Sequence, residues 1–272
     1  MSAATAKVSR HPDDARETMR VLPEFVQPLL TWLTGKPLHD QKPTRHTPVY
    51  HLLAALSSVA IGWLLCVRWN EHRSVGGTPL WLLGCLFMVS GARKLQLMIV
   101  HQCAHGTFSA GGRVNAVTGT LISTVLIIEP YESYRRGHLR DHHSKSHMTA
   151  ADPTVRFLID LVGLRPGMTV KRLWLVMLWS LVSPRFHMRV LSRRLLSQFG
   201  HSRTQALLSG LWLGVLTFVV FQTSFGTLAF TFLLPLTVAY NISGCLRLCC
   251  EHRWLVSPTH TVQDRAWYAG LS

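Results

Sequence analysis

The residues in this sequence with the clearest chemical potential are its histidines, fifteen in 272 residues. Two stand four apart in the segment His101-Gln-Cys-Ala-His105. A second group reads His138-Leu-Arg-Asp-His142-His143, with His147 four residues further on. Residues at i and i+4 share a helix face, so each such pair can aim two imidazoles at one point. Neutral imidazole is the commonest side-chain metal ligand and suits Zn, Cu, Fe and Ni. The spacing therefore predicts a histidine-rich metal site built on helices.

The number of these pairs exceeds chance. With histidine this frequent, roughly 0.8 pairs at i and i+4 are expected at random, so one pair alone would mean little. The sequence has three pairs and places four histidines within residues 138–147. The alternative interpretation is that these side chains are polar groups at the level of the lipid headgroups. The Glu-x-x-His repeats of four-helix di-iron carboxylate proteins are missing, which leaves a site dominated by histidine.

The composition indicates a membrane protein. Hydrophobic residues make up 48% of the chain and charged residues 15%, and the mean hydropathy is +0.20. These values exclude a disordered tail protein, a collagen-like chain and a disulfide-stapled mini-domain. The six cysteines lie in or beside apolar stretches without CxxC spacing, so they are interpreted as buried thiols. Because the apolar runs are long, the formal net charge of +15 fits an anionic membrane surface and no nucleic acid partner is expected.

Four segments are apolar enough to cross a bilayer, which takes about 20 residues. They are Val49–Val67, Pro79–Val100, Ala206–Phe221 and Phe225–Tyr240. Three other apolar runs are short or broken by proline and are predicted to be interfacial or re-entrant helices: Val21–Thr34, Asn115–Ile128 and Leu173–Val182. The predicted fold class is an all-α integral membrane protein with about four transmembrane helices and interfacial helices. The predicted divisions are an N-terminal segment at 1–47, a membrane domain at 48–256 and a tail at 257–272.

The basic residues orient these spans. Seven Lys or Arg precede the first span, two lie between the first two, sixteen lie between Arg93 and Arg203, none separates the last two spans, and three follow. The positive-inside tendency then predicts that both termini and the histidine-bearing loop are cytoplasmic, so that the histidines form a cytoplasmic cap. No apolar core of signal-peptide type precedes the spans. A bacterial inner membrane or an ER-type membrane is the expected location.

The histidine segments resemble those of a known family. HQCAH at the end of a second span, followed by HLRDHH and then Asp152-Pro153, is similar to the membrane fatty-acid desaturase and hydroxylase superfamily. The likeness runs from about residue 50 to 256. It implies a histidine-ligated site with two iron ions, in which the first histidine box contains His101 and His105. The second box then contains His138, His142 and His143. The resemblance also matches His252, in Cys-Glu-His-Arg-Trp, to an extra histidine found in some desaturases, and His147 is a further ligand candidate.

The same resemblance implies a reaction. It is the O₂-dependent desaturation or hydroxylation of a fatty-acyl or other lipid chain, with electrons from a separate ferredoxin, rubredoxin or cytochrome b5-like donor. An acidic donor would suit the basic cytoplasmic face. The iron would supply the oxidation chemistry, and the sequence accordingly lacks a G-x-S-x-G nucleophile motif.

One feature of the family pattern is missing. The third box, HxxHH, does not occur after the last span, where only His260 follows His252. The sequence is therefore expected to be truncated, or else to form an incomplete site. Two alternatives to a desaturase stay open, namely a histidine-rich protein that binds or transports zinc and a non-catalytic fragment of the same fold. A transporter would be expected to carry ionisable residues within its spans, and these spans carry few.

Smaller expectations concern charged residues near the histidines. Arg93 and Lys94 lie on a predicted helix near the interface and are expected to extend toward the headgroups. Five carboxylates near the boxes could accept the second N–H of a ligating imidazole: Glu129, Glu132, Asp141, Asp152 and Glu251.

Overall fold

The computed structural model describes residues 15–34, 38–40, 47–142, 152–165 and 168–251. Every regular element within these ranges is a helix, which confirms the predicted all-α class. The chain divides into two units, Met1–Thr47 and Pro48–Ser272. The predicted tail at 257–272 lies outside the described residues.

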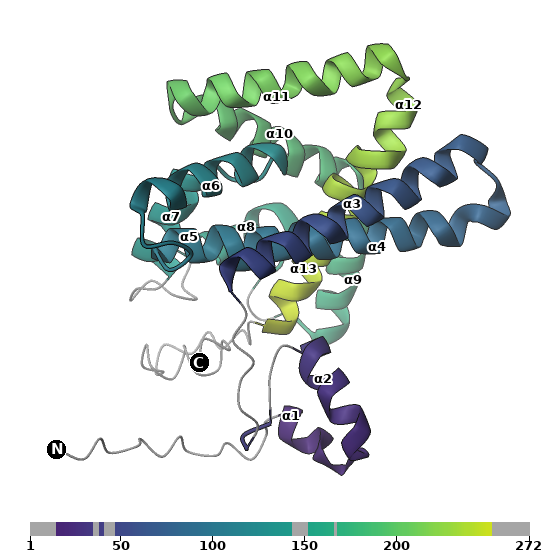
Figure 1. The fold of residues 1–272 in the computed structure, drawn as a ribbon, viewed down its shortest axis with the longest axis vertical. Helices are drawn as coiled ribbons and strands as arrows, with labels where there is room; N and C mark the ends of the chain where they lie inside the picture. The colour runs from purple at the N-terminus through teal and green to yellow at the C-terminus, as the bar shows by residue number, and fades with distance from the viewer. Residues whose placement is uncertain (1–14, 35–37, 41–46, 143–151, 166–167, 252–272) are drawn as a thin grey trace. The chain divides into compact units, whose positions relative to one another are not determined.

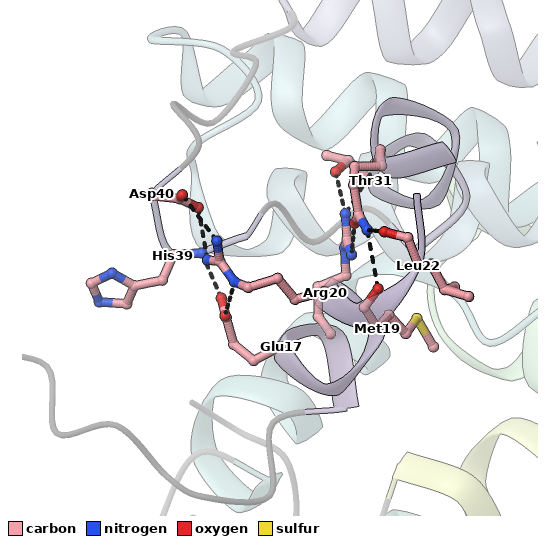
Figure 2. A network of polar contacts seen from close by, with 9 residues as sticks. Glu17, Met19, Arg20, Leu22, Thr31, His39 and Asp40 are labelled. Atoms are coloured by element: carbon pink, nitrogen blue, oxygen red, sulfur yellow. Dashed lines mark hydrogen bonds and ion pairs between the residues drawn. The ribbon is translucent and has the colours of Figure 1, made fainter. Parts of the chain in front are cut away.

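The first unit is a short helical segment held together by side-chain hydrogen bonds (Figure 2). Arg16 is buried and donates to the Gln27 side-chain oxygen at 2.7 Å and to the Thr31 hydroxyl at 2.9 Å. Gln27 in turn donates to the carbonyls of Met19 and Leu22. These bonds tie together α1 (Ala15–Thr18), the 3₁₀ turns η1 (Met19–Val21) and η2 (Glu24–Val26), and α2 (Gln27–Thr34).

A second set of contacts joins His39 and Asp40 to the helical residues Glu17 and Arg20 (Figure 2). The Arg20 guanidinium donates to both carboxylate oxygens of Asp40, at 2.9 and 3.1 Å, and to Glu17 at 3.1 Å. Glu17 also accepts the backbone N–H of His39 at 2.7 Å. Hydrogen bonding from Arg20 holds the pKa of the Asp40 carboxyl below its usual range.

Among the residues that the structure describes, four helices of the second unit are long and apolar enough to cross a membrane, which confirms the four predicted spans. The second span runs from Val75 to His105 and therefore carries the HQCAH segment at its end. The spans are made of the following elements: α3 (Pro48–His72); η3 (Val75–Gly77), α4 (Thr78–Lys94), the π-helix η4 (Leu95–Val100) and α5 (His101–His105); α11 (Arg203–Gln222); and α12 (Phe225–Leu228), the π-helix η7 (Ala229–Ala239) and α13 (Tyr240–Glu251).

Helices α3 and α4 form a tightly packed hairpin (Figure 1). Glycine lets the two backbones approach closely, as is common between membrane helices. A Cβ atom on Gly62 would lie 2.5 Å from the Gly84 carbonyl oxygen, so no larger residue fits there. The hairpin is joined to the fourth span by Trp81, whose indole N–H donates to the Phe230 carbonyl at 2.9 Å.

Arg93 points inward, which differs from the expected extension toward the headgroups. Its guanidinium lies 3.8 Å from the centre of the Tyr240 ring and donates to the Tyr240 carbonyl, to Gln96 at 2.9 Å and to Ser243 at 3.3 Å. Gly244 leaves room for it, because a Cβ there would overlap the guanidinium. Arg93 therefore links the second span to the fourth.

Shorter helices fill the stretch between the second and third spans: α6 (Gly112–Val125), α7 (Tyr131–Gly137), the π-helix η5 (His138–His142), α8 (Pro153–Phe157), the π-helix η6 (Leu158–Val162), α9 (Val170–Val182) and α10 (Pro184–Gly200). Helices α6 and α9 cover most of two of the three runs predicted to be interfacial or re-entrant, 115–128 and 173–182, and neither helix is a candidate span.

A buried polar network joins α10 and α11 to α6. Gln198 donates to the Ile128 carbonyl, and Gln205 donates to the Gln198 side-chain oxygen. Gln205 also donates to the Thr124 hydroxyl at 2.9 Å and to Ser209 at 3.2 Å. Buried amides are stable only when paired in this way, so the network fixes how α10 and α11 meet α6.

Candidate metal centre

Three histidines from two segments converge in the structure. His101 and His105 lie on α5, and His138 is the first residue of η5. One ring nitrogen from each lies within 4.8 Å of the others, and the Nε2 atoms of His105 and His138 are 3.1 Å apart. The ring centres of His101 and His138 are 4.6 Å apart. These three residues, which we call the histidine cluster, combine both histidines of the first predicted segment with one histidine of the second.

The end of α5 is fixed by its own backbone. Gly106 follows His105 with φ of +70°, a left-handed conformation that suits glycine. The Gly106 N–H donates to the Cys103 carbonyl and the Thr107 N–H to the Gln102 carbonyl, at 3.1 and 2.9 Å. This is the usual glycine-terminated end of a helix. His105 therefore occupies the last helical position, where the negative end of the helix dipole favours a cation.

Helix α7 packs one face against α5 and accounts for two of its last carbonyl groups. The Tyr131 hydroxyl donates to the Cys103 carbonyl at 2.8 Å, and the Arg135 Nε donates to the Ala104 carbonyl at 3.2 Å. Carbonyls at a helix end have no partner within the helix and need one from elsewhere. His138 stands four positions after Tyr134, directly beyond the end of α7, so the same face brings the second histidine segment to the first.

Tyr134 contacts both parts of the histidine cluster. Its hydroxyl lies 3.2 Å from His101 Nδ1, and its ring stacks on that of His138 with centres 5.1 Å apart and planes 15° apart. Burial raises the pKa of the Tyr134 hydroxyl, so the phenol stays protonated. Because this contact involves Nδ1 of His101, a metal held by the same ring would bind to its Nε2 atom.

Helix α6 packs against α7 at Gly119, where the two helices are in close contact. Gly119 faces the Tyr131 ring so closely that a Cβ atom would lie 2.6 Å from its Cε2 atom. Only glycine fits between α6 and this ring. The position of Tyr131, and through it the end of α5, thus depends on Gly119.

One π-helix directly precedes the first histidine segment, and another contains most of the second. η4 ends directly before His101, and η5 begins at His138. Short π-helical segments are rare and occur frequently at functional sites. Here the wider turns set the direction in which the histidines leave their helices.

The histidine cluster fits a transition-metal ion. Metal–nitrogen bonds of about 2.1 Å place two neighbouring ligand nitrogens roughly 3.0–3.4 Å apart, and the 3.1 Å between His105 and His138 falls within that range. His101 and His138 are partly buried, whereas His105 is exposed. Three neutral imidazoles can hold one ion and leave positions open, which is the arrangement that catalytic metal sites need.

For the other predicted site residues, the structure describes only some of the side chains. The backbone of His142 belongs to η5, but its side chain is outside the described residues, as are all of His143, His147 and His252. Asp152 is fully buried directly before α8, whereas Glu129 and Glu132 are exposed. Glu129 accepts the Ser133 hydroxyl at 2.7 Å instead of an imidazole. The side chains of Asp141 and Glu251 are not among those described.

Three residues of α7 that hold the site were missed by sequence reasoning: Tyr131, Tyr134 and Arg135. None is a common metal ligand, so the search for histidine spacing passed over them. The spacing itself held a signal, because Tyr134 stands four residues before His138 and Tyr131 seven before it, which is one face of a helix.

Comparison with known proteins gives this arrangement a context. The sequence model of the family described as fatty acid desaturase matches residues 78–270. A stretch of 96 residues is 29% identical to the temperature-sensitive sn-2 acyl-lipid omega-3 desaturase (ferredoxin), chloroplastic, of Arabidopsis thaliana, covering 35% of this chain and 18% of the relative. A stretch of 69 residues is 32% identical to the Delta(12) fatty acid desaturase of Mortierella isabellina, covering 25% of this chain and 17% of the relative. The matched parts are thus about a fifth of the length of these relatives.

Proposed function

This chain belongs to the fatty acid desaturase family, and on that premise we propose that it desaturates a fatty-acyl chain of a membrane lipid, using O₂, at a histidine-ligated di-iron centre. The observation that carries the proposal is the convergence of His101, His105 and His138 at the end of a membrane span. The second candidate reaction for the same site is hydroxylation of the acyl chain instead of desaturation.

The chain's own residues would hold the metal and orient its ligands. His101, His105 and His138 would bind one iron, and we infer that the predicted ligands His142, His143, His147 and His252 complete a site for two. When bound, the irons would supply O₂ activation and oxidation of the lipid C–H bond. The residues of α7 would keep the imidazoles in place while this occurs, through the contacts of Tyr134 with two of them.

An external protein would supply the electrons. The name of the Arabidopsis relative specifies ferredoxin, and rubredoxin or a cytochrome b5-like protein would serve the same role here. Arg185, Arg189 and Arg193 are exposed at intervals of four on α10, so they form a positive stripe. Such a stripe suits an acidic carrier, because complementary charge speeds encounter.

The proposed orientation places this chemistry in the cytoplasm. The histidine cluster lies at the end of the second span, and sixteen basic residues fall between Arg93 and Arg203. Because basic loops remain on the cytoplasmic side, the cluster and both termini are assigned to that side of a bacterial inner membrane or an ER-type membrane.

The proposal is tested by lipid analysis. The chain is expressed in a host supplied with iron and a ferredoxin system, and total acyl chains are identified by mass spectrometry. New double bonds should form with the wild type and disappear with His105→Ala. His72→Ala is the matched control, because His72 ends α3 and is remote in sequence from every histidine box. Purified protein that contains stoichiometric zinc and no iron, with unchanged host lipids, would contradict the proposal and favour a zinc protein.

A further inference from the structure

We propose that Tyr134 is a positioning residue that orients two ligands of the metal centre at once, His101 through a hydrogen bond and His138 through ring stacking. This inference rests on the proposed function, because it assumes that the histidine cluster binds a metal ion. It assigns a role to a side chain that is not itself a ligand in the proposal.

The two contacts come from one rigid placement. Tyr134 lies on α7, and His138 follows it by one helical turn, so their rings are neighbours on one face. His101 belongs to α5, 33 residues earlier in the sequence. A single side chain therefore fixes the relative position of rings from both histidine segments, at 3.2 Å from His101 Nδ1 and 5.1 Å between ring centres for His138.

The hydrogen bond selects the nitrogen that binds metal. A neutral imidazole has one N–H and one lone pair, and the partner of one nitrogen decides the state of the other. When Nε2 of His101 binds a metal, Nδ1 carries the proton and donates it to the Tyr134 hydroxyl oxygen. Metal-bound histidines almost always have such a partner, and losing it weakens metal binding by about 10- to 100-fold.

The stacking restricts the second ligand. With ring planes only 15° apart, the His138 ring cannot rotate about its Cβ–Cγ bond without separating from Tyr134. In this orientation its Nε2 atom lies 3.1 Å from that of His105. The tyrosine ring thus keeps His138 directed at the same point as His105.

The attachment of α7 to α5 does not depend on Tyr134. Tyr131 and Arg135 bind the Cys103 and Ala104 carbonyls independently. Removing the Tyr134 hydroxyl should therefore leave the helices in contact while it releases the His101 ring. This separation makes a positioning role distinguishable from simple packing.

The experiment uses the full chain in detergent and cobalt(II) as the probe, because its visible absorption reports ligand geometry. Tyr134→Phe keeps the stacked ring and loses the hydroxyl, and Tyr134→Ala loses both. Tyr240→Phe is the matched control, since it removes another buried hydroxyl, one that donates to Gln96. Cobalt affinity and spectrum are measured beside the thermal unfolding midpoint of each variant.

We expect Tyr134→Phe to lower cobalt affinity about 10-fold and to alter the absorption spectrum, Tyr134→Ala to lower affinity further, and Tyr240→Phe to retain the wild-type spectrum. If Tyr134→Phe binds cobalt with wild-type affinity and spectrum, the positioning role is wrong, although the metal centre stands. If the wild type binds neither cobalt nor iron, the proposed metal centre fails and the positioning role fails with it.

Discussion

His105 and His138 are separated by 33 residues, yet their Nε2 atoms lie 3.1 Å apart. Two neutral imidazoles at this distance can share one proton in a hydrogen bond, or both can turn their lone pairs to one ion. An ion that binds there would replace the hydrogen bond between them.

The first prediction uses this shared ion. His105→Ala and His138→Ala should each lower iron affinity by at least about 100-fold. Loss of a residue that hydrogen-bonds a ligand weakens metal binding by about 10- to 100-fold, and loss of the ligand itself should weaken it more. Because both rings serve one ion, the double variant should lose little more than either single variant. Iron content after purification at fixed free iron measures this effect. Additive losses in the double variant would show that the two histidines bind different ions.

The second prediction concerns Gly119. A Cβ there would overlap the Tyr131 ring, so Gly119→Ala should destabilise the protein by about 1–3 kcal/mol through overpacking. The displaced ring should also lower iron content, because Tyr131 binds the end of α5. Gly112→Ala is the control, since nothing lies within 4 Å of its added carbon. Equal unfolding temperatures for the two variants would contradict the packing described.

The third prediction concerns the buried polar network. Gln198→Leu should leave the Ile128 carbonyl without this donor and the Gln205 amide with one acceptor fewer, and a buried group left unsatisfied costs about 1–3 kcal/mol. The loss is measured as a fall in the thermal unfolding midpoint. Arg193→Gln, at an exposed position of the same helix, should change stability by less than about 0.5 kcal/mol. A neutral Gln198→Leu would mean that this network does not hold α10 and α11 to α6.

The fourth prediction is the orientation of the spans. A reporter active only in the cytoplasm should be active when fused after Glu251 and inactive when fused after Glu71. Glu71 lies near the end of α3, and Glu251 is the last residue of α13. The reverse pattern would place the histidine cluster on the opposite side of the membrane from the electron donor.

The fifth prediction concerns the N-terminal unit, where Val21 and Phe25 are 89% and 85% exposed. We propose that these side chains lie in the membrane interface, because large exposed apolar residues favour contact with lipid. In a background without the native cysteines, Phe25→Cys should react slowly with a water-soluble maleimide in vesicles. His39→Cys, at an exposed polar position, should react fast. Equal rates would show that Phe25 faces water.

The spans could be predicted from sequence because hydropathy is a local property. An uncharged run such as 49–67 has no stable place in water, whatever the rest of the chain does. The alignment of His101 with His105 is local as well, since helix geometry alone puts them on one face. By contrast, the meeting of His105 with His138 depends on how α7 packs on α5.

The positions of two polar side chains show the same limit. The sequence predicts that Arg93 extends toward the headgroups, whereas in the structure it binds Tyr240 and Ser243, which lie about 150 residues away in sequence. The sequence around Arg93 does not predict that it contacts those acceptors. Tyr134 was overlooked because a tyrosine becomes informative only when its neighbours in space are known.

The π-helix η4 has a consequence for the rotational phase of the second span. A π turn contains one residue more than the α turn that it replaces, so the residues after it are rotated relative to those before it. Deleting a single residue within Leu95–Val100 should restore a regular α-helix. Since each residue of an α-helix turns the chain by about 100°, His101 and His105 would then point away from His138, while the apolar face of α4 stayed packed on α3. The extra residue of the π turn thus sets the direction of His101 and His105 about the helix axis independently of the direction of the α4 face that packs on α3.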